Sequence, residues 1–143
     1  MSGHPLWTFA HALRKGLTSQ DSAEIAPSLH DEIDWTVFGP IDMFPYLGAR
    51  QGKEAVLNSI GQIAGNFQLH KIKQEEVVLD ADKASTLVRC SLNCIASRRP
   101  ISFRIAAFLR FREGRVASLR AVIDTFDLVE QVLGRPIHLP AIA

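Results

Sequence analysis

Apolar side chains recur with helical spacing in two segments of the first half of the chain. Within residues 5–17, five of them fall on one face of a helix: Leu6, Phe9, Ala10, Leu13 and Leu17. Pro5 suits the first helical position, where its missing amide hydrogen costs nothing. Residues 53–65 show the same spacing in three apolar residues: Val56, Ile60 and Ile63. Both segments are therefore predicted to be helices that bury one face.

A shorter helix is predicted between them. Thr18 and Asp21 have the spacing of a capping box, with Asp21 in place of the usual glutamate. This spacing predicts a helix that begins after Thr18, continues through Ile25 and is ended by Pro27.

Strict alternation of apolar and polar residues marks the strands. In residues 30–38, Ile33, Trp35 and Val37 alternate with polar positions, and Gly39 follows the segment. Four β-rich segments follow later in the chain, near 67–79, 84–97, 100–112 and 115–126. Their short, hairpin-like connections predict antiparallel neighbours. Residues 127–134 are expected to add one or two helical turns, with Gly134 and Pro136 as stop signals.

Residues 41–52 are irregular in pattern and contain glycine and proline, yet they also hold Met43, Phe44, Tyr46 and Leu47. A loop this apolar is expected to lie against the core as a flap.

Three helices before a run of strands then predict an α+β fold, with the helices packed on one face of a strongly curved antiparallel sheet. Helices on the concave side of such a sheet would give a cone-shaped domain with a pocket at its open end. The length of 143 residues predicts a single domain over 1–143.

Composition narrows the classes of protein. A net charge of +1 excludes a nucleic-acid-binding protein that relies on bulk positive charge, and no apolar run is long enough to span a membrane. The first residues do not resemble a secretory signal. Cys90 and Cys94 would lie about 13 Å apart along a strand, which is too far for a disulfide. Buried thiols in a reducing cytoplasm are the simpler interpretation.

Several segments resemble SnoaL-like proteins of the nuclear-transport-factor-two-like superfamily, which includes ketosteroid isomerases, polyketide cyclases and limonene epoxide hydrolases. They are the helix-helix start, the strand DEIDWTVFGP, the flap PYLGARQGKEAV, the turn FREGRV and the ending IDTFDLVEQVLG. The resemblance covers about residues 5–135. It implies a cystatin-like roll with a conical pocket and dimerisation through the outer sheet face. It is specific for the fold and weak for the reaction, since this scaffold hosts many activities.

Asp124 is the leading candidate for chemistry. It ends an apolar strand, where SnoaL-like proteins often carry a pocket acid, and apolar surroundings would raise the pKa of its carboxyl group enough for acid–base work. The alternative is that Asp124 caps the following turn or pairs with an arginine. Arg104 is the second candidate, because a hairpin centred on residues 113–114 places it opposite 123 or 124. A purely structural Arg104–Asp124 salt bridge is the alternative to catalysis.

Two relatives' reactions are not supported. Epoxide-hydrolase chemistry needs Arg-x-Asp on one strand, and residue 106 is alanine. The first helix lacks the tyrosine of a ketosteroid isomerase. The candidate ligand contacts are Trp35, Tyr46, Phe44 and Asn93, each with core packing or solvent exposure as its alternative. No histidine has a second ligand at metal spacing, so neither a metal nor another cofactor is expected.

Two functions remain open at this point. The first is a pocket protein for a small apolar molecule (polyketide-, terpenoid- or steroid-like), with cofactor-free isomerase, cyclase or hydrolase activity through Asp124 and Arg104. The second is a non-catalytic ligand-binding or protein-interaction module. In both cases the expected partners are a small apolar molecule and a second copy of the chain, with no nucleic acid and no membrane, in the cytoplasm.

Overall fold

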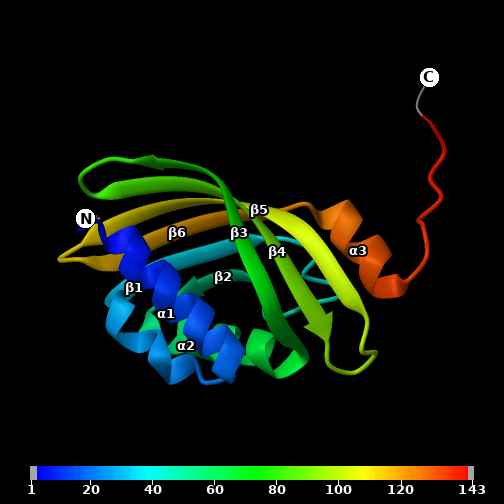
Figure 1. The fold of residues 1–143 in the computed structure, drawn as a ribbon, viewed down its shortest axis with the longest axis horizontal. Helices are drawn as coiled ribbons and strands as arrows, with labels where there is room; N and C mark the ends of the chain where they lie inside the picture. The colour runs from blue at the N-terminus through cyan, green and yellow to red at the C-terminus, as the bar shows by residue number, and fades with distance from the viewer. Residues whose placement is uncertain (1–2, 142–143) are drawn as a thin grey trace.

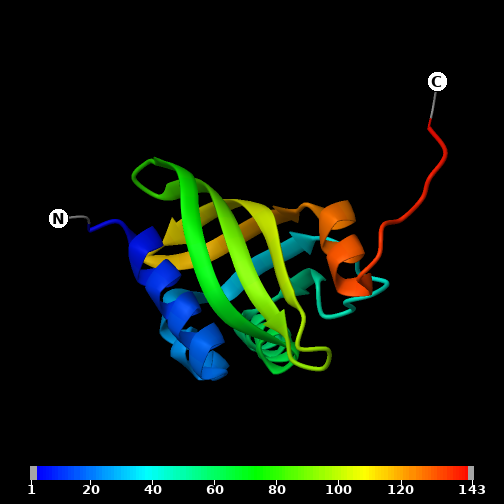
Figure 2. The same ribbon diagram turned by 45° about the vertical axis from the view of Figure 1, so that its right-hand side comes forward.

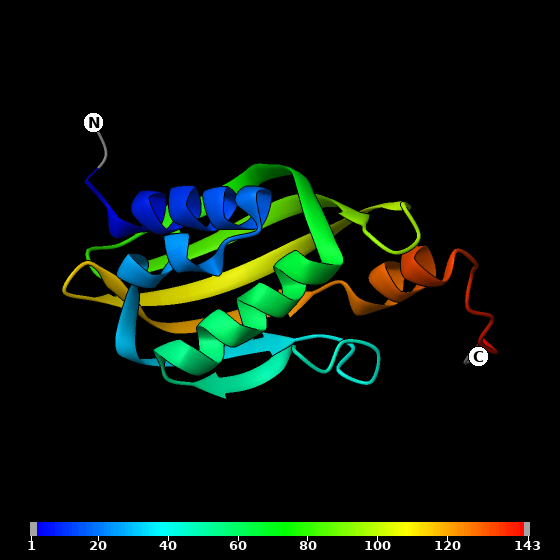
Figure 3. The same ribbon diagram turned by 90° about the horizontal axis from the view of Figure 1, so that it is seen from below.

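Six strands form one mixed sheet, and the two long N-terminal helices cover one of its faces (Figures 1 and 3). The computed structural model describes residues 3–141. The helices are α1 (Pro5–Ser19), α2 (Lys53–Asn66) and α3 (Thr125–Leu133), with short 3-10 turns η1 (Ser22–Glu24) and η2 (Ala26–Ser28). The strands are β1 (Leu29–Phe38), β2 (Gly48–Gln51), β3 (Phe67–Leu79), β4 (Lys83–Cys94), β5 (Pro100–Arg112) and β6 (Arg115–Ile123). The predicted α+β class is confirmed.

The start of α1 is held by its sequence and by a neighbouring hairpin. Pro5 occupies the first turn as predicted, and His4 caps the helix by accepting the Leu6 amide hydrogen on Nδ1 at 3.0 Å. The other ring nitrogen of His4 lies 2.6 Å from the Asp80 carbonyl oxygen in the β3–β4 turn. Figure 1 shows this end of α1 beside the tip of that hairpin.

The prediction of a helix that begins after Thr18 is wrong. Thr18 lies inside α1, and its hydroxyl donates to the Arg14 carbonyl oxygen at 2.8 Å. Asp21 is itself the cap of η1, because its side chain accepts the Ala23 amide hydrogen at 3.1 Å. The capping residue was therefore three positions later than the spacing suggested, and two 3-10 turns replace a regular helix.

The sheet has the strand order β2-β1-β6-β5-β4-β3. Strands β3 to β6 form the predicted antiparallel hairpins, but β1 pairs with β6 in the parallel sense. The expectation of an antiparallel sheet throughout is therefore wrong at one pairing. The two strands are far apart in sequence, and alternation within a strand says nothing about the direction of a distant neighbour.

The sheet bends strongly at its β3–β4 side, as Figure 2 shows. Two register shifts between β3 and β4, at Leu69/Lys71 and Gln74/Glu76, accompany this bend, as β-bulges commonly do. The concave face is apolar and packs toward the helices. Alternate residues of β5 are buried there, including Ile101, Phe103, Leu109 and Phe111.

The flap over residues 41–52 packs on the core as expected, since Phe44 and Leu47 are each only 8% exposed. It also contains β2, a short strand that pairs with β1 and that the sequence pattern did not predict. The α3 helix follows β6 at the far end of the sheet (Figure 1). Gln131 joins it to β5 by accepting the Ser102 amide hydrogen at 2.7 Å and donating to the Ser102 carbonyl oxygen at 2.6 Å.

Among residues 3–141, no helix combines the length and the apolar character that a membrane crossing requires.

Candidate functional site

A cavity of about 490 Å³ lies between the concave face of the sheet and the helices. Its walls come from α1, α2 and every strand except β2, and the flap and Leu128 of α3 contribute at one end. Most of the lining side chains are apolar, and no aspartate or glutamate is among the described residues that line it. The volume falls in the range of small-molecule sites, which span about 300–1,000 Å³.

The exposed members of the lining mark where the cavity opens. They are His11 and Arg14 of α1 and Gln74 of β3. Arg14 reaches across to β3, where its Nη2 donates to the Ile72 carbonyl oxygen at 3.5 Å. The Gln74 amide donates to the Thr86 hydroxyl at 2.9 Å. The mouth of the cavity therefore lies between α1 and β3 and is polar, whereas the interior is apolar.

Trp35 supplies a polar atom within the wall. It is 5% exposed, lies on β1 and contacts Phe9 edge to face, with ring centroids 6.4 Å apart. Its indole Nε1 is the one buried side-chain nitrogen or oxygen without a hydrogen-bond partner among the described residues. A buried donor without a partner costs about 1–3 kcal/mol, so an acceptor that reached it would be favoured.

Tyr46 brings a second donor from the flap. Its backbone carbonyl accepts a hydrogen bond from the Ser59 hydroxyl, which fastens the flap to α2. Burial of the side chain, assisted by the nearby Cys94, raises the pKa of Tyr46 to about 12. The phenol therefore keeps its proton at neutral pH and can donate a hydrogen bond. Phe44 lies beside it, with ring centroids 6.0 Å apart.

Both cysteines are buried and unbridged, as the strand spacing predicted. Cys90 lines the cavity, and burial raises the pKa of its thiol to about 12. Because the thiolate is the nucleophilic form, Cys90 acts here as a small apolar wall residue.

Asp124 does not lie in the cavity, and the prediction of a dry pocket acid is wrong. Its side chain is exposed and is not part of the cavity lining. It occupies the position that precedes α3, although its side chain makes no capping hydrogen bond there. The chain leaves the sheet after Ile123, so the carboxylate falls outside the concave face.

Arg104 lies next to Asp124 in register, but on the outer face of the sheet. The Asp124 amide donates to the Arg104 carbonyl oxygen at 3.2 Å, as the hairpin arithmetic predicted. The Arg104 guanidinium instead pairs with Glu75, with Nε 2.7 Å from Oε1, and this hydrogen bond holds the pKa of Glu75 below its usual range. Residues of β5 alternate between faces, and Phe103 and Ile105 occupy the cavity side, so Arg104 cannot.

Of the four residues predicted to contact a ligand, three line the cavity and one does not. Trp35, Phe44 and Tyr46 line the cavity, whereas Asn93 is on β4 outside the lining, beside the buried Leu92 and Cys94. Their contact with a ligand stays a prediction.

The residues at the mouth of the cavity were not predicted from the sequence. Neither His11 nor Arg14 was singled out as a candidate. The available signal was Trp7, four residues before His11 and seven before Arg14. These three side chains share a second helix face that borders the apolar one. All three line the cavity.

The SnoaL-like domain family matches residues 10–119. A solved structure of a candidate isomerase from Rhodopseudomonas palustris is 49% identical, covers 94% of this chain and 100% of its own, and superposes with a TM-score of 0.91. No curated protein sequence matches.

Two more distant structures share the fold. An LEH-like epoxide hydrolase from M. tuberculosis is 15% identical, with 89% of this chain and 88% of that chain covered and a TM-score of 0.68. TerC, co-crystallised with polyporic acid, is 14% identical, with 90% of this chain and 98% of that chain covered and a TM-score of 0.73.

Proposed function

Because the chain belongs to the SnoaL-like domain family, we propose that it binds a small apolar molecule that carries an acceptor oxygen, such as a ketone or lactone. The observation that carries this proposal is the unpartnered Trp35 Nε1 in the wall of an apolar cavity. The apolar walls would take up the hydrocarbon body of the ligand. An acceptor oxygen on the ligand would complete the hydrogen bond that the protein leaves open.

Replacing Trp35 with phenylalanine tests this proposal. The ring stays and the donor is lost, so we expect the Kd for the cyclic ketone menthone to rise about tenfold, equivalent to about 1.4 kcal/mol. Binding of menthane, the matching hydrocarbon, should not change. Isothermal titration or ligand-induced thermal shift measures both.

Trp7 provides the matched control. It also lines the cavity but is partly exposed, so Trp7→Phe removes a donor that water can satisfy. Menthone affinity should stay within about twofold of the wild-type value, well below the tenfold change expected at Trp35. Equal binding of menthone and menthane to the wild type, or an unchanged Trp35→Phe variant, would contradict the proposal.

A cofactor-free isomerase or cyclase in the same cavity is the second candidate, and the R. palustris relative favours it. The described lining has no carboxylate, so the imidazole of His11 is the group there that would act as the general base or acid. Tyr46, with its pKa of about 12, would donate to a substrate oxygen. Turnover that survives His11→Asn at the wild-type rate would exclude this assignment.

We further propose that the protein is a cytoplasmic homodimer that pairs through the outer sheet face. Phe38, Phe108 and Val122 are 53%, 53% and 49% exposed, and all three lie on that face. Exposed apolar patches of this kind often mark protein interfaces. Two free cysteines fit a reducing compartment.

Light scattering at micromolar concentration should give twice the chain mass for the wild type and the monomer mass for Phe108→Asp. Leu139→Asp is the control, since Leu139 is 66% exposed but lies in the C-terminal tail beyond α3. A monomeric wild type would overturn the dimer proposal.

A further inference from the structure

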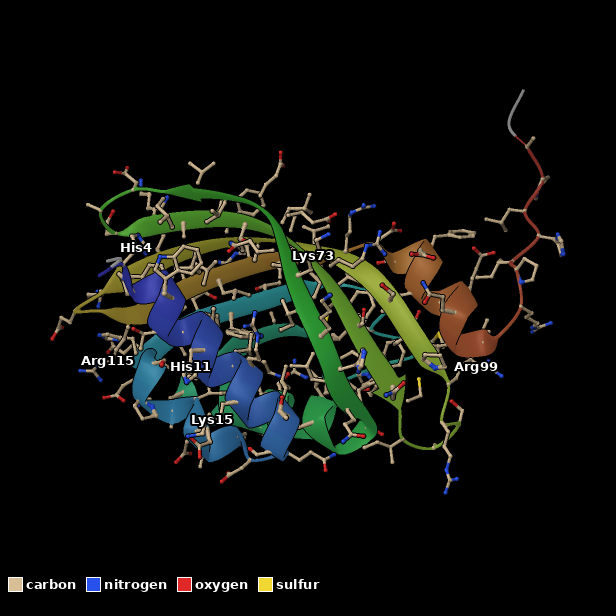
Figure 4. The ribbon with its side chains drawn as sticks, viewed as in Figure 1. His4, His11, Lys15, Lys73, Arg99 and Arg115 are labelled. Atoms are coloured by element: carbon tan, nitrogen blue, oxygen red, sulfur yellow. The ribbon has the colours of Figure 1, made fainter. Side chains whose placement is uncertain are left out.

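The mouth of the cavity carries a positive charge that takes part in none of the ion pairs among the described residues. Arg14 is the one charged side chain among the described residues that line the cavity. His11 lies three residues earlier on the same helix, which places both side chains on one face at the opening. Figure 4 shows His11 near the middle of α1, with Lys15 farther along the helix.

Arg14 is also poorly engaged by the protein. Its hydrogen bond to the Ile72 carbonyl oxygen is 3.5 Å long, at the limit for such a contact. Each of the four ion pairs among the described residues uses another cation: Lys15, Lys53, Arg104 and Arg120. A guanidinium has five N–H donors, and Arg14 is exposed, so its single side-chain hydrogen bond to the described residues leaves donors available to a ligand at the mouth.

We infer that the ligand is an amphiphile whose apolar body fills the cavity and whose carboxylate is bound by Arg14, with His11 beside it, at the mouth. This inference rests on the proposed function and adds the charge and the orientation of the ligand. A carboxylate matches the planar fork of an arginine and accepts two parallel hydrogen bonds from it. The absence of acidic side chains from the described lining leaves no internal competitor for Arg14.

The orientation follows from the division of polarity. An ionised carboxylate in the apolar interior would lose its hydration without a cation to compensate. At the mouth it keeps water on one side and gains the guanidinium on the other. The hydrocarbon part then replaces solvent along the walls formed by the concave sheet face and α1.

Dodecanoate and methyl dodecanoate provide the test, because they share a chain and differ in charge at one end. Their Kd values should be measured by displacement of an environment-sensitive dye from the wild type, Arg14→Gln and Lys15→Gln. Lys15→Gln removes the same charge one residue away, but Lys15 pairs with Glu24 and does not line the cavity.

We expect the wild type to prefer the carboxylate about tenfold, Arg14→Gln to lose that preference, and Lys15→Gln to keep it. The ester should bind all three proteins equally. Raising the salt concentration should weaken only the carboxylate, because screening acts on the exposed charge pair. This salt comparison uses the wild type alone and holds even if a variant folds poorly.

Equal binding of acid and ester to the wild type would overturn the amphiphile inference and leave the proposed binding function intact. A preference that survives Arg14→Gln in a folded protein would overturn the assignment of Arg14. Failure of both probes to bind would overturn the amphiphile inference, whereas the menthone titration tests the binding function separately.

Discussion

Replacing Ala107 with tryptophan is expected to abolish ligand binding and leave the protein folded. Ala107 lies on β5 and lines the cavity, opposite Ala121 of β6, which also lines it. Two small side chains thus face each other across a strand pair and leave room above them. An indole at position 107 would occupy the space that a ligand body needs, so menthone affinity should fall by at least about a hundredfold, or about 2.7 kcal/mol.

The folded state should tolerate this change. The cavity offers about 490 Å³ of free volume for the new ring, and filling a cavity with an apolar side chain is commonly neutral or stabilising. Thermal unfolding followed by circular dichroism should therefore give a Tm equal to or above that of the wild type. Retained menthone binding in a folded Ala107→Trp protein would show that the cavity is not the binding site.

Ala106 gives a matched control one residue away. The pleat turns its side chain to the outer face of the sheet, where it lies beside Val122 and Leu87. Ala106→Trp adds the same ring to the same strand but leaves the cavity open. Its menthone affinity per chain should equal that of the wild type, and a parallel loss in both variants would indicate general damage to β5.

Local patterns predicted the elements because helices and hairpins are set by near neighbours. The bounds of β3 and β5 match the predicted segments at both ends, and Gly134 ends α3 in the left-handed conformation with φ 74°. The parallel pairing of β1 with β6 depends instead on residues far apart in sequence. The short β2 is held by its pairing with β1 and has no alternation of its own long enough to detect.

The candidate site was harder to predict because a functional side chain must also face the right way. The predicted register, with Arg104 opposite residue 123 or 124, was correct. The turn pairs Arg112 with Arg115, and a register shift between Arg110 and Phe111 then places Arg104 opposite Asp124. The face was wrong. The apolar residues that alternate with Arg104 must point toward the helices, which leaves the Arg104 and Asp124 side chains outside the cavity. Applied strictly, the same alternation would have excluded both residues from the pocket.

Gly16→Val is expected to destabilise the protein by about 3 kcal/mol, because α1 packs against the η1 turn at this glycine. A Cβ atom at position 16 would lie 2.9 Å from Ile25 Cδ1 and 3.2 Å from the Asp21 carbonyl oxygen. Ile25 is fully buried at 0% exposure, so its side chain cannot swing into solvent to make room. The remaining outcome is that α1 moves away from η1 and loses apolar contact.

Gly65→Val separates this crowding from the effect of valine in a helix. Gly65 lies in α2, and a Cβ atom there would meet nothing within 4 Å. Its free energy of unfolding should change by less than about 0.5 kcal/mol. Urea unfolding measures both variants, and the midpoint of Gly16→Val should fall with little change in slope. Because α1 also forms one side of the cavity mouth, Gly16→Val should weaken menthone binding as well. Equal midpoints for the two variants would mean that α1 and η1 are not closely packed in solution.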